Sequence, residues 1–423
     1  MPETIGKIST NATKRPFDMK ILVLGKGARE HAFVKAFLQN TEVTEVVVSP
    51  GNAGMQAAKV TLFADDSLEA VLELCMDEAI KHVFIGAEDY LARGYTDAFK
   101  ANGIKVIGPG KEGAKLEASK DFCKRYLLAA DIPTAESSTF SDLETLKVNC
   151  NAHIRERPVV LKWDHLAGGK GVFICHTQED LDNAYTAMKS LKGSFSCLVE
   201  DYLEGKEVSA FTYVENDQLY YFGSACDYKR RTQDASSPNT GGMGAFSPNN
   251  LIDEAQLEEI TSEYTKRLLV ALKADGIEFS GFLFWGFMLV GKTPYVLEIN
   301  VRFGDPETQA ILPRIENDLS DFFFFDKKEK IRFKNKSCVH LVKVDPGYPI
   351  KTGLREEIRA SDGELEVFYA GVREQNNKLY TYGGRILGLS ALAETLPLAR
   401  EKLYLGHKQV SFAQEDFRED IGC

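Results

Sequence analysis

The chain has 423 residues, of which 44% are hydrophobic and 27% charged, and its formal net charge is −11 at pH 7. This composition is typical of a globular protein, and the length suits about three domains of roughly 150 residues each. No apolar run reaches the ~20 residues that span a bilayer, so we expect no membrane partner. The negative charge argues against a nucleic-acid partner, because phosphate backbones require a concentrated basic face. Small-molecule substrates are the better expectation.

The cysteines and the N-terminus carry little functional signal. Eight cysteines are scattered along the chain without a C-x-x-C pair, which favours reduced thiols in a cytoplasmic protein. Residues 1–18 lack the apolar segment of a secretory signal, and we expect them to form a disordered extension.

Residues 19–118 alternate short apolar runs with helical patterns, which predicts a Rossmann-like parallel sheet domain. Its first glycine turn, "GKGAREHA" (25–32), begins as G-x-G but has Glu30 where the dinucleotide fingerprint has its third glycine. The second strand ends in "VVVSPG" with no acid for a ribose hydroxyl, so a nicotinamide cofactor is disfavoured. Two interpretations stay open: a plain tight turn, or a helix N-terminus that binds a substrate phosphate.

From about Lys120 the pattern changes to strands joined by short glycine or polar turns, as in "PVVLKW" and "GVFICH", which predicts antiparallel hairpins. An amphipathic helix is expected at roughly 252–274, and a hairpin follows whose strands meet at Gly-Lys-Thr-Pro. The charged stretch 326–337 is expected to be a linker or solvated hairpin before a smaller α/β unit. We expect Phe322 to Phe325, just before it, to be core or docking residues.

A second glycine-rich loop lies in "LKWDHLAGGKGV" (161–172). A Walker loop requires Ser or Thr after Gly-Lys and a following helix, whereas here Gly171 and the β-type run "VFICH" follow. The H-R-D and D-F-G elements of protein kinases are missing. We predict a flap between two strands, whose glycines let backbone amides approach phosphates while Lys162 and Lys170 offset phosphate charge. Taken alone, the loop is better explained as a flexible surface hairpin, and the flap depends on the further stretches below.

Two further stretches suggest a nucleotide and a metal. In "CLVEDYLEGKEV" the connection around Gly205 can offer backbone groups to adenine and Glu207 to a ribose, and a solvated Glu207 without a ligand is an equally good interpretation. In "YVLEINVRFG", Glu298 and Asn300 share one face of a strand because side chains alternate with period two, and Arg302 follows on that face. Magnesium takes one or two protein oxygens and completes its octahedron with phosphates and water. One Glu and one Asn are therefore sufficient.

This combination resembles the ATP-grasp superfamily and, within it, the glycinamide ribonucleotide synthetase family of purine biosynthesis. The stretches that carry the resemblance are, in order, "GKGAREHA", "SPGNAG", "LEASK", "IPTAE", "PNTGGMGAFSP" and "RFGDPETQ". It is strong from Lys20 to about Leu319 and thinner beyond.

The resemblance implies a multidomain protein of α/β and α+β class with the ATP-grasp fold. We assign residues 19–118 to the Rossmann-like domain, 119–206 to a flap subdomain, 207–330 to a central catalytic domain and 331–423 to a C-terminal α/β domain. The implied reaction joins glycine to 5-phosphoribosylamine through an acyl phosphate, with ATP and Mg²⁺ or Mn²⁺ as cofactors. We expect a cytoplasmic monomer or weak homodimer.

The resemblance also implies roles for individual residues. The expected ATP contacts, covering phosphates, adenine and ribose, are Lys120, Lys162, Lys170, Glu200, Asp201, Tyr202, Leu203 and Glu207. The expected metal ligands are Glu298 and Asn300. The expected substrate contacts are Glu88, Asp227, Lys229, Asn239, Gly242 and Arg302. Two residues of these sets, Arg302 and Lys170, are expected to be catalytic.

The chain departs from the family's usual patterns at five positions that flank the expected site: Ala87, Tyr90, Trp163, His165 and Cys226. The alternative hypothesis is therefore a paralogous ATP-grasp ligase that joins a different amino acid or amine. A nucleotide-binding protein without turnover is disfavoured, because the lysines, Glu298 and Asn300 are all in place.

Overall fold

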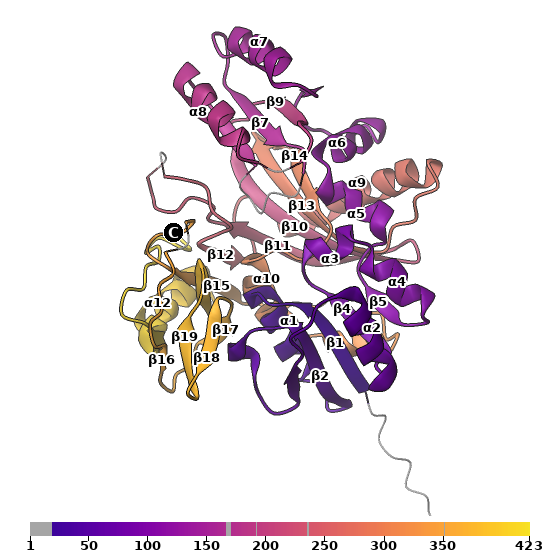
Figure 1. Cartoon of the computed structure of the whole chain (residues 1–423), viewed down its shortest axis with the longest axis vertical. Coiled ribbons are helices and arrows are strands. Elements are labelled where there is room, and N and C mark those ends of the chain that lie inside the picture. The colour runs from indigo at the N-terminus through magenta and orange to yellow at the C-terminus, as the bar shows by residue number, and fades with distance from the viewer. Residues whose placement is uncertain (1–18, 166–170, 192, 235–236, 351) are drawn as a thin grey trace, which may run out of the picture.

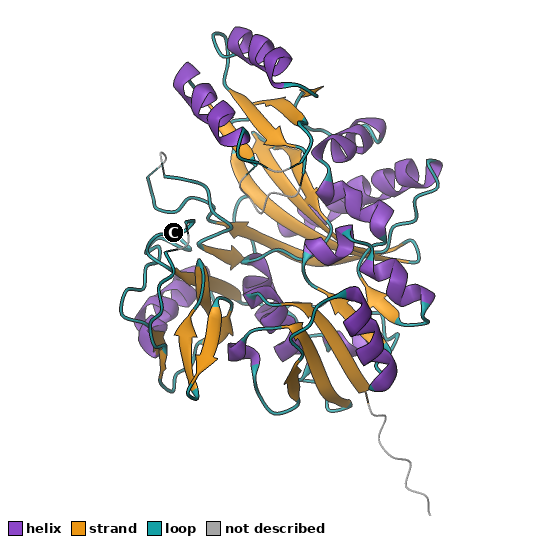
Figure 2. Ribbon diagram, viewed as in Figure 1, coloured by secondary structure: helices purple, strands orange, loops and turns teal. Residues whose placement is uncertain are grey.

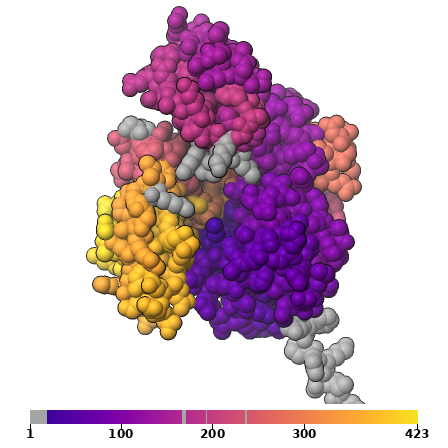
Figure 3. Space-filling view, in the orientation of Figure 1, coloured from indigo at the N-terminus to yellow at the C-terminus, as the bar shows by residue number. Residues whose placement is uncertain are grey.

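The computed structural model describes residues 19–165, 171–191, 193–234, 237–350 and 352–423 (Figure 1). The predicted disordered extension, residues 1–18, and Lys170 of the glycine loop lie outside the described residues. In the space-filling view the flap subdomain stands as a lobe above the N-terminal and C-terminal parts of the molecule (Figure 3). Within the described residues, no helix has the length and apolar character that a bilayer crossing requires.

The N-terminal domain contains a sheet of five parallel strands in the order β3-β2-β1-β4-β5, as predicted for a Rossmann-like unit. Its strands are β1 (Met19–Gly25), β2 (Val43–Pro50), β3 (Val60–Leu62), β4 (His82–Ile85) and β5 (Lys105–Ile107). Its helices are α1 (Ala28–Phe37), α2 (Leu68–Asp77), α3 (Glu88–Ala92), α4 (Tyr95–Ala101) and α5 (Lys111–Ala118), with the short 3-10 helix η1 (Ala53–Met55). Leu22 and Leu24 belong to one core and Ile21 and Val23 to another, so β1 is covered on both faces.

The flap subdomain is a four-stranded antiparallel sheet in the order β6-β9-β7-β8. Its elements are α6 (Lys120–Ala129), β6 (Ser137–Phe140), α7 (Leu143–His153), β7 (Val159–Trp163), β8 (Val172–Cys175), α8 (Gln178–Met188) and β9 (Cys197–Asp201). The expectation of short turns throughout this region was wrong, because α7 and α8 connect successive strands (Figure 2). Leu181, Ala184, Tyr185 and Met188 give α8 a buried face with helical spacing.

The central region forms a second, eight-stranded sheet in the order β14-β13-β10-β11-β12-β15-β20-β17. Its own strands are β10 (Lys206–Glu215), β11 (Gln218–Asp227), β12 (Gly244–Ser247), β13 (Gly281–Val290) and β14 (Thr293–Asn300). The predicted hairpin of β13 and β14 is confirmed, and Gly291 at its turn has a φ of 62°. The predicted amphipathic helix is α9 (Glu254–Ala274), whose Leu257, Leu268 and Leu272 are fully buried.

The sheet continues without a break into the C-terminal part of the chain, because β15 pairs with β12. The C-terminal elements are β15 (Ser337–Val344), β16 (Arg359–Ala360), β17 (Glu366–Tyr369), β18 (Val372–Gln375), β19 (Lys378–Thr381), β20 (Arg385–Ala393), α12 (Leu396–Gly406), η3 (His407–Gln409) and β21 (Val410–Ser411). Before them lie α10 (Glu307–Ile311), η2 (Leu312–Arg314) and α11 (Leu319–Phe324). Phe322, Phe323 and Phe324 are buried, which confirms the prediction that they are core residues.

Candidate active site

Three buried charged side chains meet where the flap sheet adjoins the central sheet. Val160 of β7 faces Glu200 of β9 in the antiparallel register, so Lys162, two residues on, lies on the same face of the sheet as Glu200. Lys162 Nζ lies 2.7 Å from Glu200 Oε2 and donates to the Leu297 carbonyl at 2.7 Å. Lys124 Nζ lies 2.8 Å from the other carboxylate oxygen, Oε1. Sequence reasoning predicted Lys162 and Glu200 but missed Lys124.

Glu298 of β14 is a buried anion whose ionisation responds to the charges of several predicted cations. Burial disfavours its charged form, but the positive charges of Lys229, Lys162, Lys120 and Arg302 outweigh burial and lower its pKa. Lys120 opens α6, and its Nζ donates to the His165 carbonyl at 3.0 Å. The predicted phosphate and metal residues therefore come from four places in the fold. These are β7, β14, the start of α6 and the segment just after β14.

Glu298 and Asn300 are the residues that fit a divalent cation. They lie two positions apart on β14, opposite Gly286 and Phe284 of β13. Among the described residues no group of three His, Cys, Asp or Glu side chains converges as a metal site. A metal at this pair would therefore take its remaining ligands from phosphates and water, which is how magnesium binds beside nucleotides.

Arg302 lies in a cage of carboxylates that joins the N-terminal domain to the central sheet. Its Nη2 lies 2.7 Å from Glu117 Oε1, its Nε lies 3.3 Å from Glu88 Oε2, and it donates to Asn300 Oδ1 at 3.2 Å. Burial opposes ionisation of Glu88, but Arg302 and Arg29 outweigh it and lower its pKa to about 2. Glu88 and Arg302 were predicted, whereas Glu117, the last acid of the "LEASK" stretch, was missed.

The predicted ribose and substrate residues are also neighbours. Lys229 Nζ lies 2.7 Å from Glu207 Oε2. Burial raises the pKa of Asp227 to about 6, with Lys229 opposing the rise and Glu207 and Glu298 adding to it. Glu307 was missed by sequence reasoning; burial, reinforced by Asp227, raises its pKa to about 8. Glu307 is the second acid of "GDPE", and its burial at the start of α10 was not visible from the sequence.

The loop that contains Asn239 and Gly242 is held by residues of the C-terminal region. Gly242 has a φ of 112° and abuts Pro306, so a Cβ there has no room. Arg385 Nη1 donates to the Gly241 carbonyl at 2.7 Å, and the Gly241 amide donates to the Tyr348 hydroxyl at 2.9 Å. Asn239 pairs through its backbone with Arg230.

The predicted adenine-binding stretch, Glu200 to Leu203, forms the crossover from the flap sheet to the central sheet. Asp201 ends β9 and pairs with Arg157 at 2.7 Å. The Tyr202 amide donates to the Pro158 carbonyl, and its ring packs edge-on against His176. These contacts fix the crossover without a hairpin between β9 and β10, which lie in different sheets.

The positions at which the chain departs from the family's patterns mostly lie inside domain cores. Trp163 is buried and packs at 5.4 Å, edge to face, against Phe195. Tyr90 is buried and donates to Asp66 Oδ2 at 2.6 Å, and Cys226 is buried in the main core. These side chains are therefore explained by packing.

His165 is expected to be dispensable for chemistry. Its ring Nε2 lies 2.9 Å from the Ser194 carbonyl, and its ring stands against Gly193, so the side chain joins the start of the flap to the loop before β9. We expect His165→Gly to retain a kcat within about threefold of the wild type, because a half-exposed contact contributes only about 1 kcal/mol. A loss of two orders of magnitude in the rate of ADP formation would instead make His165 part of the chemistry.

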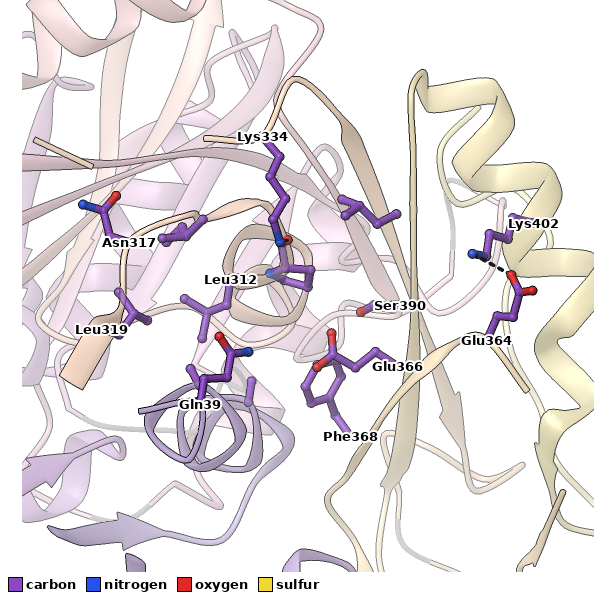
Figure 4. Close-up of a pocket in the computed structure, with 15 residues that line it drawn as sticks. Gln39, Leu312, Asn317, Leu319, Lys334, Glu364, Glu366, Phe368, Ser390 and Lys402 are labelled. Atoms are coloured by element: carbon purple, nitrogen blue, oxygen red, sulfur yellow. Dashed lines mark hydrogen bonds and ion pairs between the residues drawn. The ribbon is translucent and has the colours of Figure 1, made fainter. Parts of the chain in front are cut away.

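The cavity drawn in Figure 4 is separate from this site. It encloses about 230 Å³ between α1, η2 and the C-terminal sheet, and its walls include Gln39, Leu312, Lys334, Phe368 and Ser390. It contains none of the predicted site residues.

Three family models together match most of the chain. The N domain of phosphoribosylglycinamide synthetase matches residues 19–117, its ATP-grasp (A) domain matches 118–308, and its C domain matches 338–423. The phosphoribosylamine--glycine ligase of Caldanaerobacter subterraneus subsp. tengcongensis is 36% identical over 96% of this chain and all of the relative. That of Streptococcus suis is 35% identical over 96% of this chain and 99% of the relative.

Solved structures give the same result. The crystal structure of phosphoribosylamine--glycine ligase from Thermotoga maritima superposes with a TM-score of 0.81 and 31% identity, covering 95% of this chain and all of the other. A biotin carboxylase complex from Campylobacter jejuni superposes with a TM-score of 0.71 at 17% identity, covering 93% of this chain and 92% of that one, which shows a shared fold alone.

Proposed function

The chain belongs to the phosphoribosylglycinamide synthetase family, and we propose that it joins glycine to 5-phosphoribosylamine, using ATP and a divalent metal, to give glycinamide ribonucleotide, ADP and phosphate. The observation that supports this most is that Lys162, through the Leu297 carbonyl, and Arg302, through Asn300 Oδ1, are bonded to the segment of β14 that contains Glu298 and Asn300. Such a site neutralises the charge of a polyphosphate beside a metal ligand.

The reaction has two steps. A glycine carboxylate oxygen attacks the γ-phosphorus of ATP, the bond to the β–γ bridging oxygen breaks, and ADP leaves. The amine of phosphoribosylamine then attacks the carbonyl carbon of the acyl phosphate, phosphate leaves with the C–O bonding electrons, and the nitrogen loses a proton. Neither step requires a side-chain nucleophile, because phosphoryl transfer is catalysed mainly by positioning and charge neutralisation.

Most of the predicted residues have a task in this scheme. Lys120 and Lys162 hold the phosphates, and the crossover from Glu200 to Leu203 holds adenine through its backbone. Glu298 and Asn300 would hold magnesium, which would supply charge neutralisation at the phosphate oxygens. Arg302, fixed by Glu88 and Glu117, presents its charge to the phosphoryl group in transfer. Glu207 and Lys229, already paired, line the ribose side of the cleft.

The substrates are tested by measuring ADP release from the purified protein with a panel of amino acids, with and without phosphoribosylamine generated in situ. We expect ADP formation to require glycine and phosphoribosylamine together. Stimulation by another acid or amine, with none from this pair, would support the alternative of a paralogous ligase. The cytoplasmic location and the monomer or weak homodimer stay predictions, and the oligomeric state is measured by sedimentation of the same protein.

A further inference from the structure

We propose that Lys124 and the carboxylate of Glu200 are positioning residues that aim Lys162 at the nucleotide phosphates. This inference rests on the proposed ATP site and goes beyond it, because it gives the Glu200 side chain a task other than recognition of adenine. It also assigns a function to a lysine that no sequence motif singled out.

The first step of the argument counts the hydrogen bonds of Lys124. An ammonium group has three donors. Lys124 Nζ has three acceptors, namely Thr134 Oγ1 at 2.6 Å, the Ala135 carbonyl at 3.0 Å and Glu200 Oε1 at 2.8 Å. Its side chain is 6% exposed. Lys124 is therefore fully satisfied by the protein and has no donor left for a ligand.

Lys162 differs in this count. Within the described residues its Nζ has two acceptors, Glu200 Oε2 and the Leu297 carbonyl, each at 2.7 Å. One N–H direction has no partner among the residues that the structure describes, on the lysine whose charge also acts on Glu298. The third donor of Lys162 is thus available to a phosphate oxygen, and its direction is set by the two bonds already made.

Glu200 couples the two lysines. Each carboxylate oxygen pairs with one ammonium group, and the carboxylate side chain is only 3% exposed. Two cations against one anion leave a net charge of +1 on this triad, which favours an incoming phosphate. Without Lys124, Lys162 would be the only cation of the triad that pairs with the Glu200 carboxylate. Glu200 would then bind Lys162 more strongly, and a phosphate would compete with Glu200 for Lys162 less well.

The triad is also anchored to the strand that carries the metal pair. The Thr134 hydroxyl, which accepts from Lys124, donates to the Val296 carbonyl at 2.7 Å, and the Val296 amide donates to the Pro133 carbonyl at 2.8 Å. Val296 and Leu297 precede Glu298 on β14. The network therefore sets the position of Lys162 relative to Glu298, which is the geometry that phosphoryl transfer requires.

The test is a double-mutant cycle of Lys124→Met and Glu200→Gln, with kinetics of ADP formation and calorimetric binding of ADP as readouts. We expect each single variant to raise the KM for ATP about 10-fold or more, because misplaced catalytic groups have effects of that size. The double variant should resemble Glu200→Gln alone, since Lys124 acts through Glu200. The proposal would be overturned if the KM of the double variant rose by the product of the two single-variant increases. An unchanged KM for ATP in Lys124→Met would also overturn it.

Glu200→Gln gives an independent measurement that does not depend on the folding of the lysine variant. If the carboxylate positions Lys162, the substitution should weaken the binding of ATP and the binding of GTP by the same factor, because both nucleotides carry the same triphosphate. A change in the ATP-to-GTP preference would mean that the carboxylate contacts the base, and would overturn the proposal.

The chain offers a matched control in Lys343, a second buried lysine remote from the cleft. Its Nζ donates to the His407 and Val410 carbonyls and pairs with Glu415 at 2.8 Å. Lys343→Met should lower thermal stability but leave the KM for ATP unchanged. A wild-type protein that binds ADP but forms none from ATP when glycine and phosphoribosylamine are supplied would contradict the proposed reaction. In that case the double-mutant cycle with ADP binding as its readout still tests the triad.

Discussion

Replacing Glu298 with alanine is expected to reduce ADP formation at least about 100-fold, the size of effect seen when one major electrostatic stabiliser is removed. The physical reason is twofold. Glu298 is one of the two residues of β14 that we propose as ligands of a divalent cation, and the charges of four cationic side chains lower its pKa. Without it the cations repel one another and the metal loses its carboxylate. The measurement is the steady-state rate of ADP release at ordinary magnesium concentrations.

A matched control for Glu298→Ala is Glu364→Ala. Glu364 pairs with Lys402 at 3.0 Å on the surface, away from the cleft. This variant should retain full activity, because exposed ion pairs contribute about 0–1 kcal/mol. Near-normal ADP formation by Glu298→Ala would contradict the assignment of Glu298 as a metal ligand.

The elements that were predicted correctly are those whose signal is local. The β13 to β14 hairpin was predicted from two apolar runs around a glycine turn, and α9 from apolar residues at helical spacing. Helix α8 was missed, although Thr177 and Asp180 form a capping box at its start. Its sequence is polar apart from four spaced residues, and the strands on either side suggested a hairpin.

The candidate site divides in the same way. Glu298, Asn300 and Arg302 were predicted together because alternate residues of an extended chain lie on one face; β14 ends at Asn300, and Arg302 lies just beyond it. Lys124 and Glu117 were missed because their partners lie far along the chain: Glu117 pairs with Arg302, and Lys124 pairs with Glu200. A lysine in an amphipathic helix is usually solvated, and nothing local indicates that α6 turns this one inward. Long-range charge pairing is set by how the domains pack, which a single sequence does not reveal.

Replacing Arg302 with methionine is expected to reduce turnover about 10²–10³-fold or more and to destabilise the fold. Two effects combine here. The guanidinium lies within reach of Glu117, Glu88 and Asn300 at once, and its loss leaves the buried Glu117 and the half-buried Glu88 without this partner. Breaking a buried ion pair by removing one partner costs about 3–5 kcal/mol. Thermal unfolding and ADP release measured on the same preparations quantify both effects.

A second substitution separates catalysis from folding. In Arg302→Met combined with Glu117→Gln, the buried charge left by the first change is removed, so we expect thermal stability to recover in part. Turnover should not recover, because the cation that we propose to neutralise the transferring phosphoryl group is still absent. Arg302→Lys should give an intermediate rate, since a lysine keeps the charge but cannot reach three acceptors with a planar fork. Recovery of turnover together with stability would show that Arg302 holds the domains together and takes no part in the chemistry.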